Sequence, residues 1–206
     1  MVPLDNLIVL EGIDGAGTTT QARLLTQRLK QNSRTVWATS EPTGSPIGRL
    51  IREILRSDLE ADPETIAHLF AADRSHHLRG SDGIIAHLSA GDIVVCDRYK
   101  YSSLAYQSVD MPMEVITALN ARFPDPGLLF FVDLPVETGA QRLSRRSSLE
   151  IFEYDEFQHK VRSNYLRVLD KASTTTRLHV LDGTQTVEAI AEKIWNYVKD
   201  SSIFKE

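Results

Sequence analysis

The stretch GIDGAGTTT, residues 12–20, follows the apolar run of residues 7–10 and leads into a segment with apolar residues at helical spacing. Glycine permits backbone angles that other residues avoid, so successive N–H groups can point at a phosphate, and the dipole of the following helix strengthens that attraction. We expect the helix to begin near Gln21, with Ala22, Leu25 and Leu29 on one face. The stretch therefore predicts a phosphate-binding loop. Its candidate ligand-binding residues are Gly12, Ile13, Asp14, Gly15, Ala16, Gly17, Thr18 and Thr19.

The loop departs from the usual P-loop pattern at one position. In that pattern the last glycine precedes a lysine and then a serine or threonine whose hydroxyl reaches Mg²⁺. Here Gly17 precedes Thr18, while Thr19 keeps the hydroxyl in register. A glycine-rich turn that binds nothing is the alternative, but the order of strand, turn and helix favours a phosphate site. Losing one such donor costs on the order of 3 kcal/mol of transition-state stabilisation, so another group must supply the charge or the reaction is slow.

Further apolar, β-rich runs indicate the fold class. They lie at residues 35–38, 93–96, 128–132 and 178–181, and segments with helical periodicity separate them. Strands that are apolar along their length and alternate with helices are typical of a parallel sheet covered on both faces. We therefore expect an α/β fold with a five-stranded parallel sheet. At 206 residues, one domain over residues 1–206 is the expected organisation.

Composition limits the partners and the location. The formal net charge of -5 argues against broad nucleic-acid binding, which requires excess lysine and arginine. No apolar run is long enough to span a bilayer, and the N-terminus does not resemble a secretory signal, so we expect a soluble, cytoplasmic protein without a membrane partner. Residues 142–156 are polar and predict a mobile flap, and residues 200–206 are expected to fray.

Three further segments, taken together with the loop, resemble those of thymidylate kinases in order, spacing and identity. They are LFAADR at residues 69–74, DRY and AYQ at residues 97–99 and 105–107, and EPTGSPIG at residues 41–48. The match extends from residue 7 to about residue 165. The resemblance implies a P-loop nucleoside monophosphate kinase fold and transfer of the ATP γ-phosphoryl group to dTMP, giving dTDP for dTTP synthesis. It also implies Mg²⁺ as cofactor and a homodimer.

Phe70 and Arg74 are candidates for binding a base. They lie four residues apart and so share a helix face, where a ring can stack on a pyrimidine and a guanidinium can bond a base carbonyl. A core phenylalanine and a surface arginine are the alternative, which the neighbouring motifs disfavour. The resemblance implies that these two residues hold thymine. It also implies that the base, the sugar and the rest of the acceptor are bound by Glu41, Pro42, Ser103, Tyr106 and Gln107.

Asp97 and Arg98 end the third strand, at the edge where open α/β sheets bind ligands. Arg98 suits two-point binding of the acceptor phosphate, and Asp97 would orient Arg98 or a Mg²⁺-bound water. A solvated ion pair is the alternative. Asp14 repels anions, and in the resembling family it contacts the sugar hydroxyl and aligns the acceptor phosphate. Asp14 and Arg98 are thus candidate catalytic residues, and Thr19 and Asp97 are candidate magnesium ligands.

Arg145 and Arg146 are the remaining catalytic candidates. They lie with Arg142 in the polar stretch, where the resembling family places a lid, here expected at about residues 142–153. Bacterial members of the family carry lid arginines when the loop beside Asp14 has none, and this chain fits that subtype. Cations at a solvated helix end are the alternative. Thr184 and Gln185 follow the last strand and are candidates for contacting adenine, although a plain turn accounts for them equally well.

Two other positions also differ from the family pattern. Ser40 and Ile151 stand where members often have arginine, so, with the loop lysine, three positive charges are absent in total. Two other functions therefore remain open at this point. One is a kinase for another deoxynucleotide or a deoxynucleoside, and the other is a weakly catalytic nucleotide-binding regulator. Arg98 favours a phosphorylated acceptor, and turnover with dTMP separates the three functions.

Overall fold

A parallel five-stranded sheet lies at the centre of the computed structural model, which describes residues 2–144, 151–172, 174 and 176–203. Within these residues the elements in chain order are β1 (Leu4–Gly12), α1 (Thr18–Gln31), β2 (Val36–Ser40), α2 (Pro46–Leu55), α3 (Pro63–Arg79), α4 (Ile84–Ser89), β3 (Ile93–Asp97), α5 (Lys100–Tyr106), the 3-10 helix η1 (Gln107–Val109), α6 (Met113–Asn120), β4 (Pro126–Asp133), α7 (Val136–Ser144), α8 (Ile151–Ala172), β5 (Arg177–Asp182) and α9 (Val187–Lys199).

The strand order is β2-β3-β1-β4-β5, with every neighbouring pair parallel. Val9 of the central strand β1 pairs with Cys96 of β3 on one side and Leu129 of β4 on the other. All three side chains are fully buried, because helices cover both faces of the sheet. The five strands predicted from the apolar runs are confirmed, and so is the α/β fold class. Four strands contain the whole predicted run, whereas β2 starts one residue later than its predicted run of residues 35–38.

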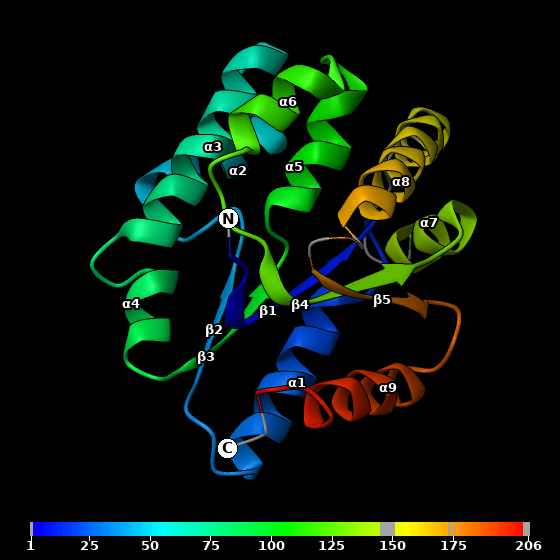
Figure 1. Ribbon diagram of the computed structural model, residues 1–206. Coiled ribbons are helices and arrows are strands. Elements are labelled where there is room, and N and C mark those ends of the chain that lie inside the picture. Colours follow the sequence, from blue (N-terminus) through cyan, green and yellow to red (C-terminus); the bar gives the residue numbers. More distant parts are fainter. Residues whose placement is uncertain (1, 145–150, 173, 175, 204–206) are drawn as a thin grey trace.

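Helices lie on both sides of the sheet (Figure 1). Helices α1 and α9 pack together below it in this view, whereas α2, α3, α5, α6 and α8 lie above it. The expected start of the first helix near Gln21 is wrong, since α1 begins at Thr18. Gly17, with φ 91° in the left-handed region, ends the loop, and the three threonines that follow are already helical.

The carboxyl ends of β1 and β3 lie next to one another in the sheet, although the chain between them first forms β2 at the edge of the sheet. This reversal of connection direction is where open α/β sheets form ligand crevices. The residues that follow these two ends are the glycine-rich loop and Arg98. The fold thus brings together two motifs that the sequence separates by about eighty residues.

The described residues bear on two expectations about flexible segments. In the polar stretch 142–156, α7 extends to Ser144 and α8 begins at Ile151, so the described residues at both ends of the stretch are helical. Arg145 and Arg146 lie outside the described residues. The end of the chain is not wholly frayed, since Ser201 and Ile203 are buried and the Ser201 hydroxyl donates to the Val198 carbonyl at 2.6 Å. Across the described part of the chain, no helix combines the length and the apolar character needed to cross a membrane.

Candidate functional site

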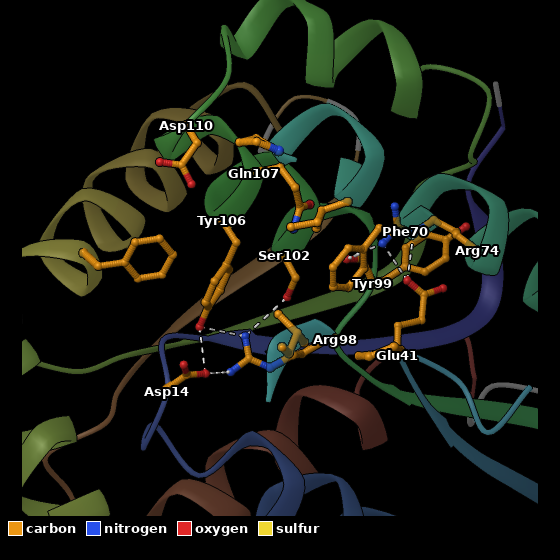
Figure 2. Close-up of a pocket in the computed structure, with 15 residues that line it drawn as sticks. Asp14, Glu41, Phe70, Arg74, Arg98, Tyr99, Ser102, Tyr106, Gln107 and Asp110 are labelled. Carbon is orange, nitrogen blue, oxygen red and sulfur yellow. Dashed lines mark hydrogen bonds and ion pairs between the residues drawn. The ribbon is translucent and has the colours of Figure 1, made fainter. Parts of the chain in front are cut away.

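A cavity of about 400 Å³ opens beside the carboxyl ends of β1 and β3 (Figure 2). Its lining combines apolar side chains with charged ones, among them Asp14 and Arg98. Eight of the predicted residues line it, namely Asp14, Glu41, Pro42, Phe70, Arg74, Arg98, Tyr106 and Gln107. The remaining lining residues, which the sequence did not identify, are Leu55, Pro63, Ile66, Tyr99, Ser102, Asp110 and Phe157.

Arg98 and Asp14 form an ion pair at the floor of this cavity. Arg98 Nη2 donates to Asp14 Oδ1 at 2.7 Å, and Arg98 Nη1 donates to the Tyr106 hydroxyl at 3.0 Å. The Tyr106 hydroxyl in turn donates to Asp14 Oδ1 at 2.9 Å, which closes a three-residue ring that is visible in Figure 2. Burial raises the pKa of the Tyr106 hydroxyl far above its ordinary value, so it stays a neutral donor. The ring holds a cation at the cavity floor, where an anionic group can meet it.

Gln158 of α8 completes the contacts of Asp14. Its Nε2 donates to Asp14 Oδ2 at 3.0 Å, and its Oε1 accepts the Asp14 backbone N–H at 3.4 Å. The side chain is only 1% exposed. Nothing in the sequence pattern marked this residue, because its partner lies 144 positions away in the chain. Gln158 therefore fixes both the backbone and the carboxylate of the loop aspartate.

Arg74 is only 1% exposed, so it is not the surface arginine of the alternative interpretation. Its Nε donates to Glu41 Oε2 at 2.8 Å and its Nη1 to Asn120 Oδ1 at 2.5 Å. Its Nη2 donates to the Tyr99 carbonyl at 3.2 Å and to Ser103 Oγ at 3.0 Å. Arginine has five N–H groups, so these four bonds, counted over the described residues, leave one on Nη1. Phe70, one helical turn earlier, lines the cavity directly (Figure 2).

Of the other residues predicted to bind the phosphoryl acceptor, some line the cavity and others hold the residues that line it. Ser103 is 2% exposed and does not line the cavity; its hydroxyl supports Arg74, whereas the neighbouring Ser102 forms the wall. Glu41 is buried between Arg74 and His77, whose Nδ1 lies 2.9 Å from Glu41 Oε1. Pro42, which follows a cis peptide bond, lines the cavity. The helical phase of α5 decides which serine faces the cavity, and the motif alone did not give that phase.

A second, larger cavity of about 920 Å³ lies over the glycine-rich loop. The residues from Ile13 to Thr19 line it, as does Gln185. Gly12 and Thr184 are not part of its wall. A Cβ on Gly12 would lie 2.8 Å from that of Ala16, so this glycine lets the loop fold back on itself. The Thr184 hydroxyl and backbone N–H instead donate to Asp182 at 2.6 and 2.9 Å, forming the plain turn that was the alternative for this residue.

The two candidate metal ligands lie together at this cavity. The Thr19 hydroxyl donates to Asp97 Oδ2 at 2.5 Å. Asp97 Oδ1 is buried and has no hydrogen-bond partner among the described residues. A hydroxyl and a carboxylate are hard oxygen ligands of the kind that Mg²⁺ takes beside substrate phosphates. The orphaned oxygen and the donor set therefore fit a magnesium ion. Among the residues that the structure covers, no group of three or more His, Cys, Asp or Glu side chains could hold a metal by itself.

Arg142 of α7 brings a second cation to the wall of the larger cavity, beside Arg98. Its Nη1 donates to the Gly15 carbonyl at 3.3 Å and its Nη2 to the Gly183 carbonyl at 3.0 Å. Helix α7 can approach the loop this closely because Gly15 faces Gly139, whose carbonyl would lie 2.7 Å from a Cβ on Gly15. The sequence named Arg142 only as part of a polar stretch, since the glycine contact that places it joins two distant segments.

Comparison with known proteins gives one consistent result. The family model described as Thymidylate kinase matches residues 10–194. A protein of Treponema pallidum is 37% identical over 201 residues, covering 96% of each chain. Proteins of Pyrococcus horikoshii and Methanococcus aeolicus are 39% and 35% identical over 199 and 204 residues, covering 93% and 97% of this chain and 95% and 99% of their own. The names of all three assign them as thymidylate kinases.

Proposed function

This chain belongs to the thymidylate kinase family, and on that premise we propose that it transfers the γ-phosphoryl group of ATP to dTMP, giving dTDP and ADP. One structural observation carries the proposal beyond family membership. Asp14 and Arg98 line both the smaller cavity and the larger cavity over the loop. Two phosphates, one held in each cavity, would therefore lie next to one another at the wall that the cavities share. In-line phosphoryl transfer requires this arrangement.

The acceptor side is assigned to the smaller cavity. Phe70 would stack on thymine, and the remaining Nη1 N–H of Arg74 would bond a base carbonyl, since its other donors are held by the protein. Arg98 would bind the acceptor phosphate, because a guanidinium matches two phosphate oxygens at once. Asp14 supports Arg98 by the 2.7 Å ion pair and remains 39% exposed, so its carboxylate can also reach a sugar hydroxyl.

The donor side is assigned to the larger cavity. Backbone N–H groups of the glycine-rich loop and the positive end of α1 would bind the ATP phosphates. Thr19 and Asp97 would hold Mg²⁺, the hydroxyl as a ligand and the carboxylate directly or through water. When bound, Mg²⁺ neutralises charge on the donor phosphates. Gln185, which lines the same cavity, is proposed to contact adenine; Thr184 stays a weaker proposal because Asp182 already engages it.

The charge of the missing loop lysine is proposed to come from arginines that follow α7. Thr18 is 4% exposed and carries no charge, so the loop cannot supply one at this position. Arg145 and Arg146 are proposed as the catalytic cations on a lid at about residues 142–153, following the subtype with lid arginines. Arg142, which lies shortly before them in the chain, lines the larger cavity, and this supports the assignment.

We further propose that residues 1–206 act as one kinase domain, that the chain forms a homodimer, and that it works in the cytoplasm. These three points rest on the family and on the sequence. The net charge of -5 supports small anionic ligands, bound by local groups, in preference to nucleic acid. Analytical ultracentrifugation of the full chain tests the dimer, and a sedimenting mass near 23.1 kDa would contradict it.

An acceptor panel tests the proposed function. Purified chain, ATP and Mg²⁺ are incubated with dTMP, dUMP, dCMP or thymidine, and the nucleotide products are separated by ion-exchange chromatography. We expect dTDP from dTMP and no dTMP from thymidine, because Arg98 recognises an acceptor that already carries a phosphate. Faster conversion of thymidine or dCMP than of dTMP would assign the chain to a different acceptor.

A further inference from the structure

Glu11, the penultimate residue of β1, is fully buried and accepts four hydrogen bonds. Its Oε1 accepts the backbone N–H groups of Tyr99 at 2.9 Å and Ser102 at 3.2 Å. Its Oε2 accepts the hydroxyls of Ser102 at 2.6 Å and Tyr165 at 2.9 Å. A buried carboxylate is tolerated only when hydrogen bonds replace its lost water, and these four donors fill its acceptor positions.

The partners of Glu11 flank Arg98, whose backbone is strained. Arg98 has φ 69°, in the left-handed region that side-chain-bearing residues rarely adopt. Such a conformation persists only where the surroundings fix it. The Arg98 N–H donates to the Leu10 carbonyl at 2.9 Å, and the next N–H, that of Tyr99, donates to Glu11. Two consecutive residues of β1 thus hold the backbone on either side of the Arg98 Cα atom.

Ser102 connects Glu11 to the Arg98 side chain. Its hydroxyl donates to Glu11 Oε2, which orients the oxygen to accept from Arg98 Nη1 at 3.5 Å. The Tyr165 hydroxyl lies 2.8 Å from Ser102 Oγ and also contacts Glu11, so the three groups form a compact triangle in which only Ser102 lines the cavity. Glu11 itself does not line the cavity.

We propose that Glu11 is a positioning residue for the acceptor phosphate, holding the strained Arg98 backbone through Tyr99 and the Arg98 guanidinium through Ser102. The proposal rests on the proposed function, because it assigns Arg98 to the phosphate of dTMP. Geometry, and not negative charge, carries the effect. Burial raises the pKa of Glu11 to about 7, and a proton on Oε2 would leave both contacts of Oε1 intact. Tyr99 and Arg98 therefore stay in place in either protonation state.

Two substitutions separate geometry from charge. Glu11→Gln removes the charge but keeps the length, so its amide oxygen can accept both backbone N–H groups while its NH₂ donates to Ser102 or Tyr165. Glu11→Asp keeps the charge but is one methylene too short to reach the same donors. The matched control is Asp125→Asn, since Asp125 also anchors the start of α5, through the Tyr101 hydroxyl at 2.5 Å and Lys100 at 2.8 Å, and does not line the cavity.

Steady-state kinetics of the full chain, varying dTMP and ATP separately, give the test. We expect Glu11→Asp to raise the KM for dTMP about tenfold with the KM for ATP changed less than about twofold, and Glu11→Gln and Asp125→Asn to stay within about threefold of wild type. An unchanged KM for dTMP in Glu11→Asp, equal losses for both substrates, or a Glu11→Gln loss as large as that of Glu11→Asp would overturn the proposal.

Two further results keep the outcomes distinct. If thermal melting shows that Glu11→Asp does not fold, Ser102→Ala decides, with an expected rise of about threefold in the KM for dTMP and none for ATP. An unchanged KM for dTMP in Ser102→Ala then overturns the positioning role. Failure of the wild-type chain to phosphorylate dTMP would instead overturn the proposed function, whereas normal wild-type turnover with insensitive Glu11 variants overturns only the role of Glu11.

Discussion

Arg98 Nη2 lies 2.7 Å from Asp14 Oδ1, and this ion pair forms the wall that the two cavities share. The two residues come from the ends of neighbouring strands, β3 and β1, and both have partners that fix them. Tyr106 bonds to both, and Gln158 holds the second carboxylate oxygen of Asp14. The pair is therefore rigid before a substrate arrives, which lowers the cost of organising charge around a transferring phosphoryl group.

Replacing Arg98 by lysine should reduce kcat/KM for dTMP on the order of 100-fold. Lysine keeps a positive charge but cannot bond Asp14, Tyr106 and a phosphate together, because it lacks the planar fork of arginine. Initial rates at varied dTMP measure the effect. Arg23→Lys is the control, since Arg23 is exposed, lines neither cavity, and donates through Nη1 to Gln27 Oε1 at 3.3 Å. A loss below about threefold for Arg98→Lys would contradict its role at the phosphate.

Asp97→Asn should raise the Mg²⁺ concentration required for half-maximal activity by about tenfold or more. The amide keeps a hydrogen bond to Thr19 but removes the charge that attracts a divalent cation. Titrating Mg²⁺ at fixed ATP measures the shift, and binding of dTMP without metal should not change. An identical Mg²⁺ dependence in the variant and the wild type would exclude Asp97 from the metal site.

Arg146→Ala should lower kcat by about 100-fold with little change in the KM for dTMP. A cation that acts on the transferring group stabilises the transition state more than the ground state, so its loss appears in turnover. Single-turnover measurements with excess enzyme separate this step from product release. Unchanged turnover would remove Arg146 from the catalytic residues and leave Arg142 and Arg98 as the described cations of the larger cavity.

Gln158→Leu should raise the KM for dTMP about tenfold, because Asp14 loses the partner that holds both its backbone N–H and Oδ2. Asn164→Leu is the matched control. Asn164 lies on the same helix, is also buried, and donates to the Ala105 carbonyl at 3.0 Å away from Asp14. Both variants should lose stability, measured by thermal melting, but only Gln158→Leu should raise the KM for dTMP. Equal kinetic effects would mean that Gln158 acts through packing of α8.

The stability of the fold should depend on pH through Glu11. Burial raises its pKa from 4.5 to about 7, so the folded state binds the proton more tightly than the unfolded state. The resulting stabilisation is fully present below pH 4.5 and is lost as the pH rises through 7. Relative to Glu11→Gln, the wild type should lose on the order of 3 kcal/mol in its free energy of unfolding between about pH 4.5 and pH 8.

Urea denaturation at several pH values measures this difference, with the Gln variant as the reference that does not titrate at this position. Parallel pH profiles for the two proteins would show that Glu11 does not change protonation in this range. A wild type that gains stability as the pH rises, relative to the variant, would mean that the four hydrogen bonds outweigh burial and lower the pKa of Glu11.

The sequence predicted those parts of the site that local patterns encode. Apolar runs gave the five strands, and the order of strand, glycines and helix gave the loop, because these depend on neighbours in the chain. The spacing of Phe70 and Arg74 placed both at one cavity, since a helix fixes that relation. It did not reveal that Arg74 is buried and bonded to Glu41 and Asn120, because these partners come from other elements.

What the sequence missed depends on tertiary contacts and on helical phase. The sequence predicts Ser103 as a pocket residue, yet Ser102 lines the cavity, because one residue along a helix turns the side chain by about 100°. No local pattern marks Glu11, because its four donors lie 88 to 154 positions away. Gln158 and Arg142 likewise acquire their positions from packing against the loop, which no local pattern records.

Direct detection of dTDP tests the central claim that the paired cavities pass a phosphoryl group from ATP to dTMP. Wild-type chain and Arg98→Lys are incubated with γ-³²P-labelled ATP, Mg²⁺ and dTMP, and the labelled products are separated. We expect rapid transfer of label into dTDP by the wild type and a rate about 100-fold lower for the variant. Label that appears only as inorganic phosphate, or dTDP formed equally fast by both proteins, would contradict it.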